Sequence, residues 1–146
     1  MNERTTRQVI LAVAVALIGV GGVAQADDDE RRCSVATLRG SYLFAASGYN
    51  IVAGVAQPKA IIEVIRFDGN GSLAVPAATV SINGTIVQPP PNGTGTYTIA
   101  PDCSGTLLFS SGQAFNLFVA PGSRGFSMIQ TNPFTVLQGK VVKLPR

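Results

Sequence analysis

Residues 59–82, KAIIEVIRFDGNGSLAVPAATVSI, contain two runs of alternating apolar residues joined by a glycine-rich turn. In the first run, every second residue from 61 to 67 is apolar except Glu63, and successive side chains of an extended strand point to opposite faces. Asp68-Gly69-Asn70-Gly71 supplies residues that tolerate a positive φ, as tight hairpin turns require. The stretch therefore predicts two antiparallel strands, at 59–67 and 72–82.

The same pattern of short alternating runs and turn residues extends along the rest of the chain. Asn83-Gly84 and residues 101–105 and 121–125 provide turns, and Pro89-Pro90-Pro91 makes a stiff connection that cannot lie inside a sheet. One helical turn is expected at 34–39, ended by Gly40. The further predicted strands are 41–47, 93–100, 105–110, 114–120, 125–131 and 135–144.

Eight short strands joined by short connections predict an all-β, antiparallel meander. No amphipathic helix of about 10–15 residues lies between the strands, which excludes βαβ units. We expect the meander to close into a barrel, because closure removes exposed strand edges, and the alternative is an open β-sandwich. An eight-stranded barrel is either filled by side chains or holds one small ligand, and the sequence leaves both possibilities open.

The first 26 residues have the form of a secretory signal peptide. A short basic segment precedes an apolar run at 9–23, and Ala24-Gln25-Ala26 is an A-x-A cleavage site. The run is short and interrupted by glycines, so we expect no membrane span in the mature chain, which is predicted to be secreted or periplasmic. The predicted organisation is a signal peptide at 1–26, a disordered acidic and basic leader at 27–32, and one β-barrel domain at 33–146.

Charge and cysteine content narrow the classes of function. Removing the signal peptide lowers the formal net charge from +3 to about +2, which gives no electrostatic basis for binding nucleic acid. Cys33 and Cys103 are the only cysteines, and an oxidising compartment favours a disulfide between them. The chain has no histidine, so serine–histidine catalysis and histidine metal sites are excluded. We expect neither a metal ion nor a cofactor.

Three motifs carry a resemblance to a known family. They are C-S-x-x-T-L-x-G-S-Y-x-F at 33–44, F-D-G-N-G-S-L at 67–73, and G-T-Y-T-I-x-x-D-C-S-G-T-L at 95–107. With these motifs the chain resembles small secreted bacterial proteins of largely unassigned function that have calycin-like or allene-oxide-cyclase-like β-barrels. The resemblance covers most of residues 33–131 and implies the barrel fold and a bridge between the two cysteine-bearing motifs. Cyclase activity is not implied, because no catalytic position of that activity matches.

Five residues are candidates for a ligand site. Glu63 is the one acid on the apolar face of a predicted strand, where burial would raise its pKa and fit it for proton transfer. A one-residue slip in register would instead turn Glu63 outward and Arg66 inward, and Arg66 could also pair with an anionic head group at the barrel rim. Tyr42 and Tyr97 share the apolar face, and Gln130 would be a polar group at one barrel end. Each also has a purely structural interpretation, as a core tyrosine or a solvated surface residue.

Three functions fit these observations. The first is a non-catalytic barrel that binds a small apolar molecule, as calycins do. The second is a structural or surface-associated protein with a filled core. The third is a cofactor-independent cyclase or isomerase in which Glu63 or a tyrosine assists the reaction. An empty volume inside the barrel would favour the first and third, whereas a solid core would remove both. The sequence does not indicate the oligomeric state.

Overall fold

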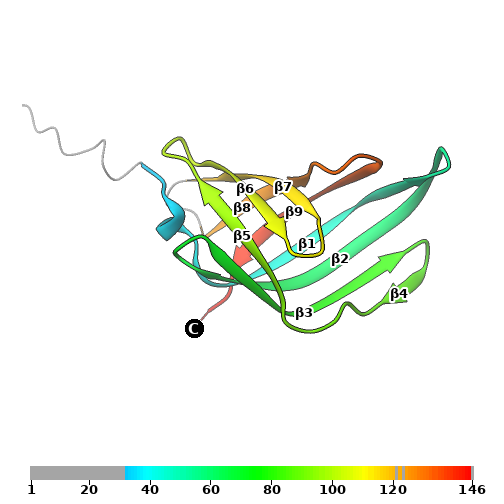
Figure 1. The fold of residues 1–146 in the computed structure, drawn as a ribbon, viewed down its shortest axis with the longest axis horizontal. Coiled ribbons are helices and arrows are strands. Elements are labelled where there is room, and N and C mark those ends of the chain that lie inside the picture. The colour runs from blue at the N-terminus through cyan, green and yellow to red at the C-terminus, as the bar shows by residue number, and fades with distance from the viewer. Residues whose placement is uncertain (1–31, 121, 123, 146) are drawn as a thin grey trace, which may run out of the picture.

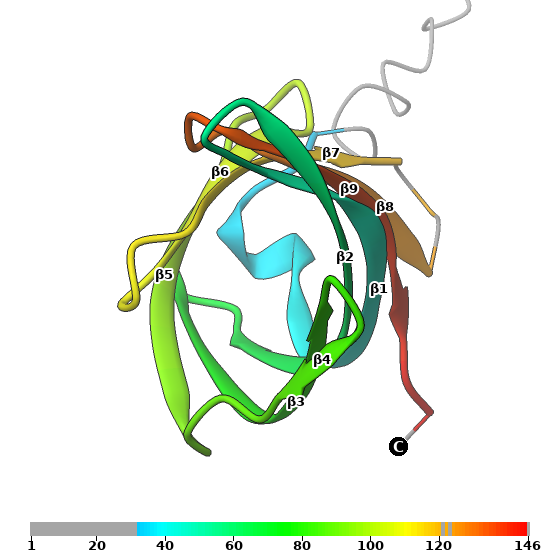
Figure 2. The same ribbon diagram turned by 90° about the vertical axis from the view of Figure 1, so that its right-hand side faces the viewer.

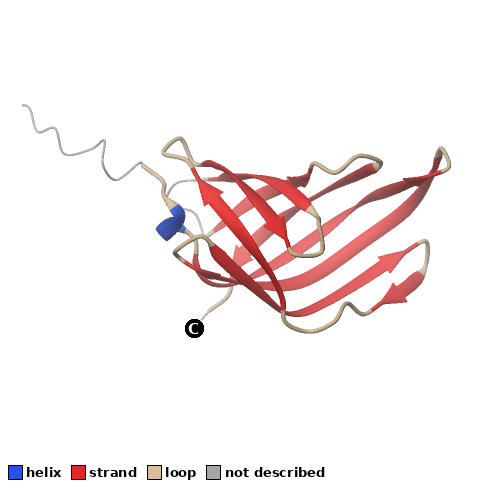
Figure 3. Ribbon diagram, in the orientation of Figure 1, coloured by secondary structure: helices blue, strands red, loops and turns tan. Residues whose placement is uncertain are grey.

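The structure, a computed structural model, describes residues 32–120, 122 and 124–145 of the 146-residue chain. The predicted signal peptide and most of the predicted leader lie outside the described residues. The described part consists of nine strands and one short 3₁₀ helix, η1 (Figures 1 and 3). Their bounds are η1 Val35–Thr37, β1 Arg39–Val52, β2 Val55–Asp68, β3 Ser72–Ile82, β4 Thr85–Val87, β5 Gly93–Ile99, β6 Ser104–Phe109, β7 Ala114–Val119, β8 Gly125–Gln130 and β9 Thr135–Lys143.

Eight of these strands form a closed antiparallel barrel. Hydrogen bonding connects them in the order β2-β1-β9-β8-β7-β6-β5-β3, and the pairing of β2 with β3 closes the ring. The remaining strand, β4, pairs only with the end of β3 and extends the wall as a hairpin (Figure 2). The predicted all-β barrel is therefore confirmed, and the alternative of an open sandwich is wrong.

The first hairpin is much longer than predicted. β1 and β2 pair along their whole lengths, and the chain turns at Ala53-Gly54, where φ is 50° and 79°. The first two strands were predicted at 41–47 and 59–67, and Gly48, Gly54 and Pro58 lie in the stretch between them. Backbone hydrogen bonds do not require apolar alternation, so the ladder continues through these residues.

The start of the domain also differs from the prediction. The helical segment is η1 alone, followed by Leu38 in an extended conformation. Gly40 does not end a helix but lies inside β1. Its φ of 104° is a backbone angle that residues with a side chain rarely adopt. None of the helices among the described residues is long and apolar enough to cross a membrane.

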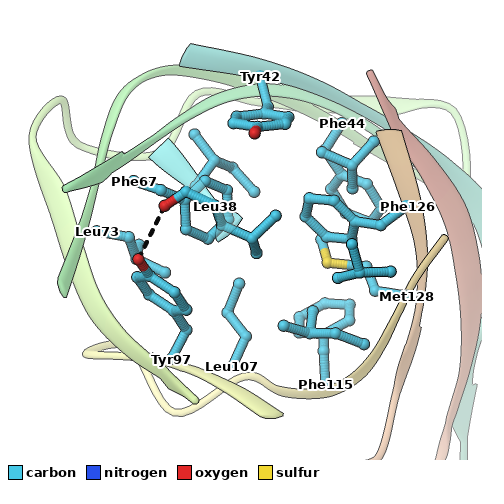
Figure 4. Packing of buried hydrophobic residues seen from close by; sticks show 14 of the residues in the cluster. Leu38, Tyr42, Phe44, Phe67, Leu73, Tyr97, Leu107, Phe115, Phe126 and Met128 are labelled. Carbon is cyan, nitrogen blue, oxygen red and sulfur yellow. Dashed lines mark hydrogen bonds between the residues drawn. The ribbon is translucent and has the colours of Figure 1, made fainter. Parts of the chain in front are cut away.

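One end of the barrel is closed by η1 and the disulfide. Figure 2 looks into the opposite end and shows η1 across the far side of the interior. Cys33, just before η1, is bonded to Cys103 in the turn between β5 and β6, as predicted. The hydroxyl of Tyr97 donates a hydrogen bond to the carbonyl oxygen of Leu38 at 2.9 Å (Figure 4) and also lies 2.9 Å from that of Val35. The bridge and these contacts fix η1 against the barrel wall.

Aromatic side chains fill the half of the barrel next to η1. Phe67 lies at the centre of this packing and contacts Tyr42, Tyr97 and Phe126 edge to face, with ring centroids 5.4, 4.9 and 5.9 Å apart. Figure 4 shows these side chains pointing into the interior together with Leu38. This half of the barrel is therefore a packed core with no room for a ligand.

Candidate functional site

The other half of the barrel encloses a cavity of about 580 Å³. It lies toward the end that carries the β1–β2 and β3–β4 turns, on the side away from η1 (Figure 1). Most of its wall is apolar, with side chains from strands all around the ring. Among these wall residues are Ile61 on β2, Val80 on β3, Phe109 on β6, Phe115 on β7 and Leu137 on β9.

Toward this end of the barrel the inward-facing residues of β1 become small. The inward positions change from Tyr42 and Phe44 to Ala46 and Gly48. Gly48 lets β1 and β9 approach closely, since a Cβ atom there would lie 1.8 Å from the carbonyl oxygen of Val136.

The mouth of the cavity forms where β3 changes its neighbour. Residues 72–75 of β3 pair with β5, whereas residues 80–82 pair with β4. Between these segments Pro76 and Ala77 are both exposed, which breaks the alternation and turns the end of β3 away from β5. The chain returns to β5 through Pro89-Pro90-Pro91, and these prolines line one side of the mouth.

Glu63 faces the cavity from β2, opposite Phe44 on β1 and Ala78 on β3. Its side chain is only 7% exposed, and its Oε1 atom has no hydrogen-bond partner among the described residues. Burial raises the pKa of the carboxyl group to about 7, an effect that the positive charge of Lys59 partly opposes. Near neutral pH this carboxyl can therefore accept or donate a proton inside an apolar cavity.

Gln130, at the end of β8, places a second polar group in the same cavity. It is 8% exposed, and its Nε2 atom donates a hydrogen bond to Oδ1 of Asn132 at 2.9 Å. The Oε1 atom of Gln130 is buried without a hydrogen-bond partner among the described residues. Glu63 and Gln130 are thus two buried acceptors that border one apolar volume.

Lys59 is a site residue that the sequence analysis missed. It lines the cavity four residues before Glu63 on β2, and burial lowers the pKa of its amino group. The signal was present in the sequence, because residues 59, 61 and 63 share one face of a strand. The predicted inward-facing set on this strand began at Ile61 and left out Lys59.

The structure separates the five predicted candidates into three groups. Glu63 and Gln130 line the cavity. Tyr42 and Tyr97 face inward but belong to the packed half, where the Tyr97 hydroxyl is already used by η1. Arg66 is exposed on the outer wall, between the inward-facing Ile65 and Phe67, so the alternative register that would turn it inward is wrong.

Within the residues that the structure describes, no three His, Cys, Asp or Glu side chains come together in a way that could hold a metal ion. Comparison with known proteins adds no relative: the chain matches no family model, no curated protein and no solved structure. The candidate site is therefore defined by its geometry, an apolar cavity with two buried acceptors and one amine.

Proposed function

We propose that this chain is a binding protein that holds a small, mostly apolar molecule in the open half of its barrel. The observation that carries the proposal is the cavity of about 580 Å³, which has an apolar wall and a few convergent polar groups. Ligand pockets in proteins commonly measure roughly 300–1,000 Å³ and have this kind of lining. The resemblance to calycin-like barrels supports the same function.

The proposed place of action is outside the cytoplasm, in the periplasm or the medium. The disulfide between Cys33 and Cys103 supports it, because such bonds persist in oxidising compartments. The signal-like composition of residues 1–26 supports it as well.

A structural role with a filled core has less support. Packing of that kind is present next to η1, but the cavity interrupts it in the other half. Wall residues such as Phe109 and Phe115 contact one another edge to face, but side chains leave the cavity itself unfilled, and an unfilled apolar cavity costs stability. A bound apolar molecule would restore the missing contacts.

Binding can be tested with a dye whose fluorescence rises in apolar surroundings, N-phenyl-1-naphthylamine. The mature protein should bind it saturably. Ala78 lines the cavity beside Glu63, so Ala78→Phe should fill part of the volume and weaken dye binding by about tenfold or more. Absence of dye binding to the folded protein would refute the proposal.

Ala77 offers the matched control, because it is the next residue on β3 and is exposed. Ala77→Phe adds the same side chain outside the barrel and should leave the dye affinity unchanged. Circular dichroism should show that both variants keep the fold. Equal loss of binding in the two variants would mean that the dye does not occupy the cavity.

A second candidate, a cofactor-independent isomerase or cyclase, rests on the Glu63 carboxyl, whose pKa of about 7 suits an acid or base. The two functions differ in what happens to the bound molecule. A ligand extracted from protein of the native host can be returned to fresh protein and analysed by mass spectrometry and NMR. An unchanged molecule supports binding, whereas a rearranged one supports catalysis.

A further inference from the structure

We infer that the ligand is an apolar molecule with a neutral hydrogen-bond donor, a hydroxyl group, which it directs at the buried oxygens of Gln130 and Glu63. This inference rests on the proposed binding function and specifies the chemical class of the molecule. It follows from the way the site orients its polar atoms.

The orientation of the Gln130 amide is set by Asn132. The Oδ1 atom of Asn132 accepts the backbone N–H of Ala114 at 2.8 Å, and its Nδ2 atom donates to the carbonyl oxygen of Gly112 at 3.0 Å. These two bonds fix which end of the Asn132 side chain is the acceptor. Gln130 must then offer its NH₂ group to that acceptor, which it does at 2.9 Å.

The consequence is a fixed acceptor in the cavity wall. Because the NH₂ group of Gln130 is held by Asn132, its Oε1 atom is the end left buried without a partner among the described residues. Rotating the Gln130 amide by 180° would bring its Oε1 atom against the Oδ1 atom of Asn132, which are two acceptors with no proton between them. A buried acceptor without a donor costs free energy, so a ligand that supplies a donor is favoured over one that does not.

Glu63 supplies a second buried acceptor that calls for a hydrogen-bond donor. Its Oε1 atom is likewise buried and has no hydrogen-bond partner within the described residues. Gln130 comes from β8 and Glu63 from β2, so the two residues line the cavity from different parts of the ring. A hydroxyl group suits both residues, since it can donate a hydrogen bond to an oxygen and can also accept one from a neutral carboxyl group.

The charges at the site favour a neutral head group. Lys59 and Glu63 are the charged side chains among the described residues that line the cavity. A carboxylate ligand would bring a negative charge and further acceptors to Glu63 and Gln130. An ammonium ligand would bring a positive charge into an apolar cavity that already contains Lys59. An alcohol avoids both costs.

Matched ten-carbon probes test the inference by displacing N-phenyl-1-naphthylamine from the wild-type protein. The set comprises 1-decanol, its methyl ether, decanoate and decylamine, measured at one pH and ionic strength. Decanol and its ether differ in the donor and one methyl group, so decanol should bind about tenfold more tightly than the ether. It should also bind more tightly than decanoate and decylamine.

Two variants test whether Gln130 gives the cavity its preference for the alcohol over the ether. Gln130→Leu removes the fixed acceptor and leaves that of Glu63, so it should lower the ratio of ether to alcohol dissociation constants below the wild-type value. Gln138→Leu is the matched control, because Gln138 is exposed on β9, and it should keep the wild-type ratio. Thermal unfolding checks that each variant is folded, and the wild-type series remains a test if Gln130→Leu is not.

The possible results separate the inference from the proposed function. If the dye binds but the ether competes as well as decanol, the inference is wrong and the binding function stands. Tighter binding of decanoate or decylamine would also overturn it, as would an unchanged ratio in folded Gln130→Leu. If the folded protein binds neither dye nor decyl probe, the binding function itself fails.

Discussion

Tyr97 on β5 donates its hydroxyl proton to the carbonyl oxygen of Leu38 at 2.9 Å, across 59 residues of sequence. The same hydroxyl also contacts the carbonyl oxygen of Val35, so one side chain satisfies both backbone groups at the end of η1. Together with the packed aromatic rings, this contact makes one end of the barrel a stabilising core. The stability of this core can then offset the cost of the small residues and buried polar groups in the open half.

Tyr97→Phe tests the role of this contact. The variant keeps the ring that packs against Phe67 but removes the hydroxyl that contacts both carbonyl oxygens, of which that of Val35 keeps its hydrogen bond from the backbone N–H of Leu38. We expect it to lower the free energy of unfolding by about 1–3 kcal/mol in urea denaturation. Tyr49→Phe is the control, since Tyr49 is exposed, and it should change stability by less than about 0.5 kcal/mol. Equal effects of the two variants would contradict the role assigned to Tyr97.

The disulfide should stabilise the same end of the barrel. It joins residues 70 positions apart, and Cys33→Ser or Cys103→Ser should each lower the free energy of unfolding by about 2–5 kcal/mol. The double variant should lose no more than either single variant, because both remove one bond. Chemical denaturation of the three proteins checks this, and losses that add would show that the bond is absent from the folded protein.

The strands were predictable because apolar residues recur at alternate positions on the inward face, although large apolar residues such as Ile62 and Phe118 also lie on the outer face. That rule placed Glu63 inside, and it identified all eight strands of the barrel. It failed at residues 48–58, where pairing depends on backbone hydrogen bonds rather than on apolar side chains. It also missed β4, whose three residues are too few to show a period.

Alternation assigns a residue to a face of the sheet but not to a level along the barrel axis. Tyr97 and Gln130 both face inward, yet one lies in the packed core and the other at the cavity. Their levels depend on how the strands are staggered around the closed ring, which is a property of the whole barrel. For the same reason, the cavity itself could not be predicted, because its wall combines residues from strands far apart in the sequence.

Gly48→Ala tests how closely β1 and β9 must approach. The added Cβ atom would lie 1.8 Å from the backbone carbonyl oxygen of Val136, so the two strands would have to separate. We expect a loss of about 2 kcal/mol or more in the free energy of unfolding. Gly93→Ala is the control, because its Cβ would meet Val75 at an ordinary 3.6 Å, and it should be tolerated. A stable Gly48→Ala protein would mean that the crossing has more space than the structure shows.

Glu63 should make the stability of the protein depend on pH. Its carboxyl pKa is about 7 in the folded state and near the ordinary 4.5 in the unfolded chain, so the folded state binds more protons between these values. The free energy of unfolding should therefore fall as pH rises from about 4.5 to 7, by roughly 3 kcal/mol in all. Glu63→Gln carries no titrating group and should lose this dependence. It should be more stable than the wild type at pH 8, where the wild-type carboxylate is ionised in an apolar cavity.

Urea denaturation at pH 5 and pH 8 measures the difference, and an NMR titration of the Glu63 carboxyl carbon reports its pKa directly. Asp68→Asn is the control, because hydrogen bonds from the backbone N–H groups of Asn70 and Ser72 lower the pKa of Asp68. The stabilisation that Asp68 gives the folded state is therefore lost only below its ordinary pKa, which lies outside the range from pH 5 to pH 8. Asp68→Asn should keep the wild-type dependence of the free energy of unfolding on pH. A Glu63 pKa near 4.5, or a Glu63→Gln variant with the wild-type slope, would place the carboxyl group in water. The cavity would then lose the acid on which catalysis depends and one of its two buried acceptors.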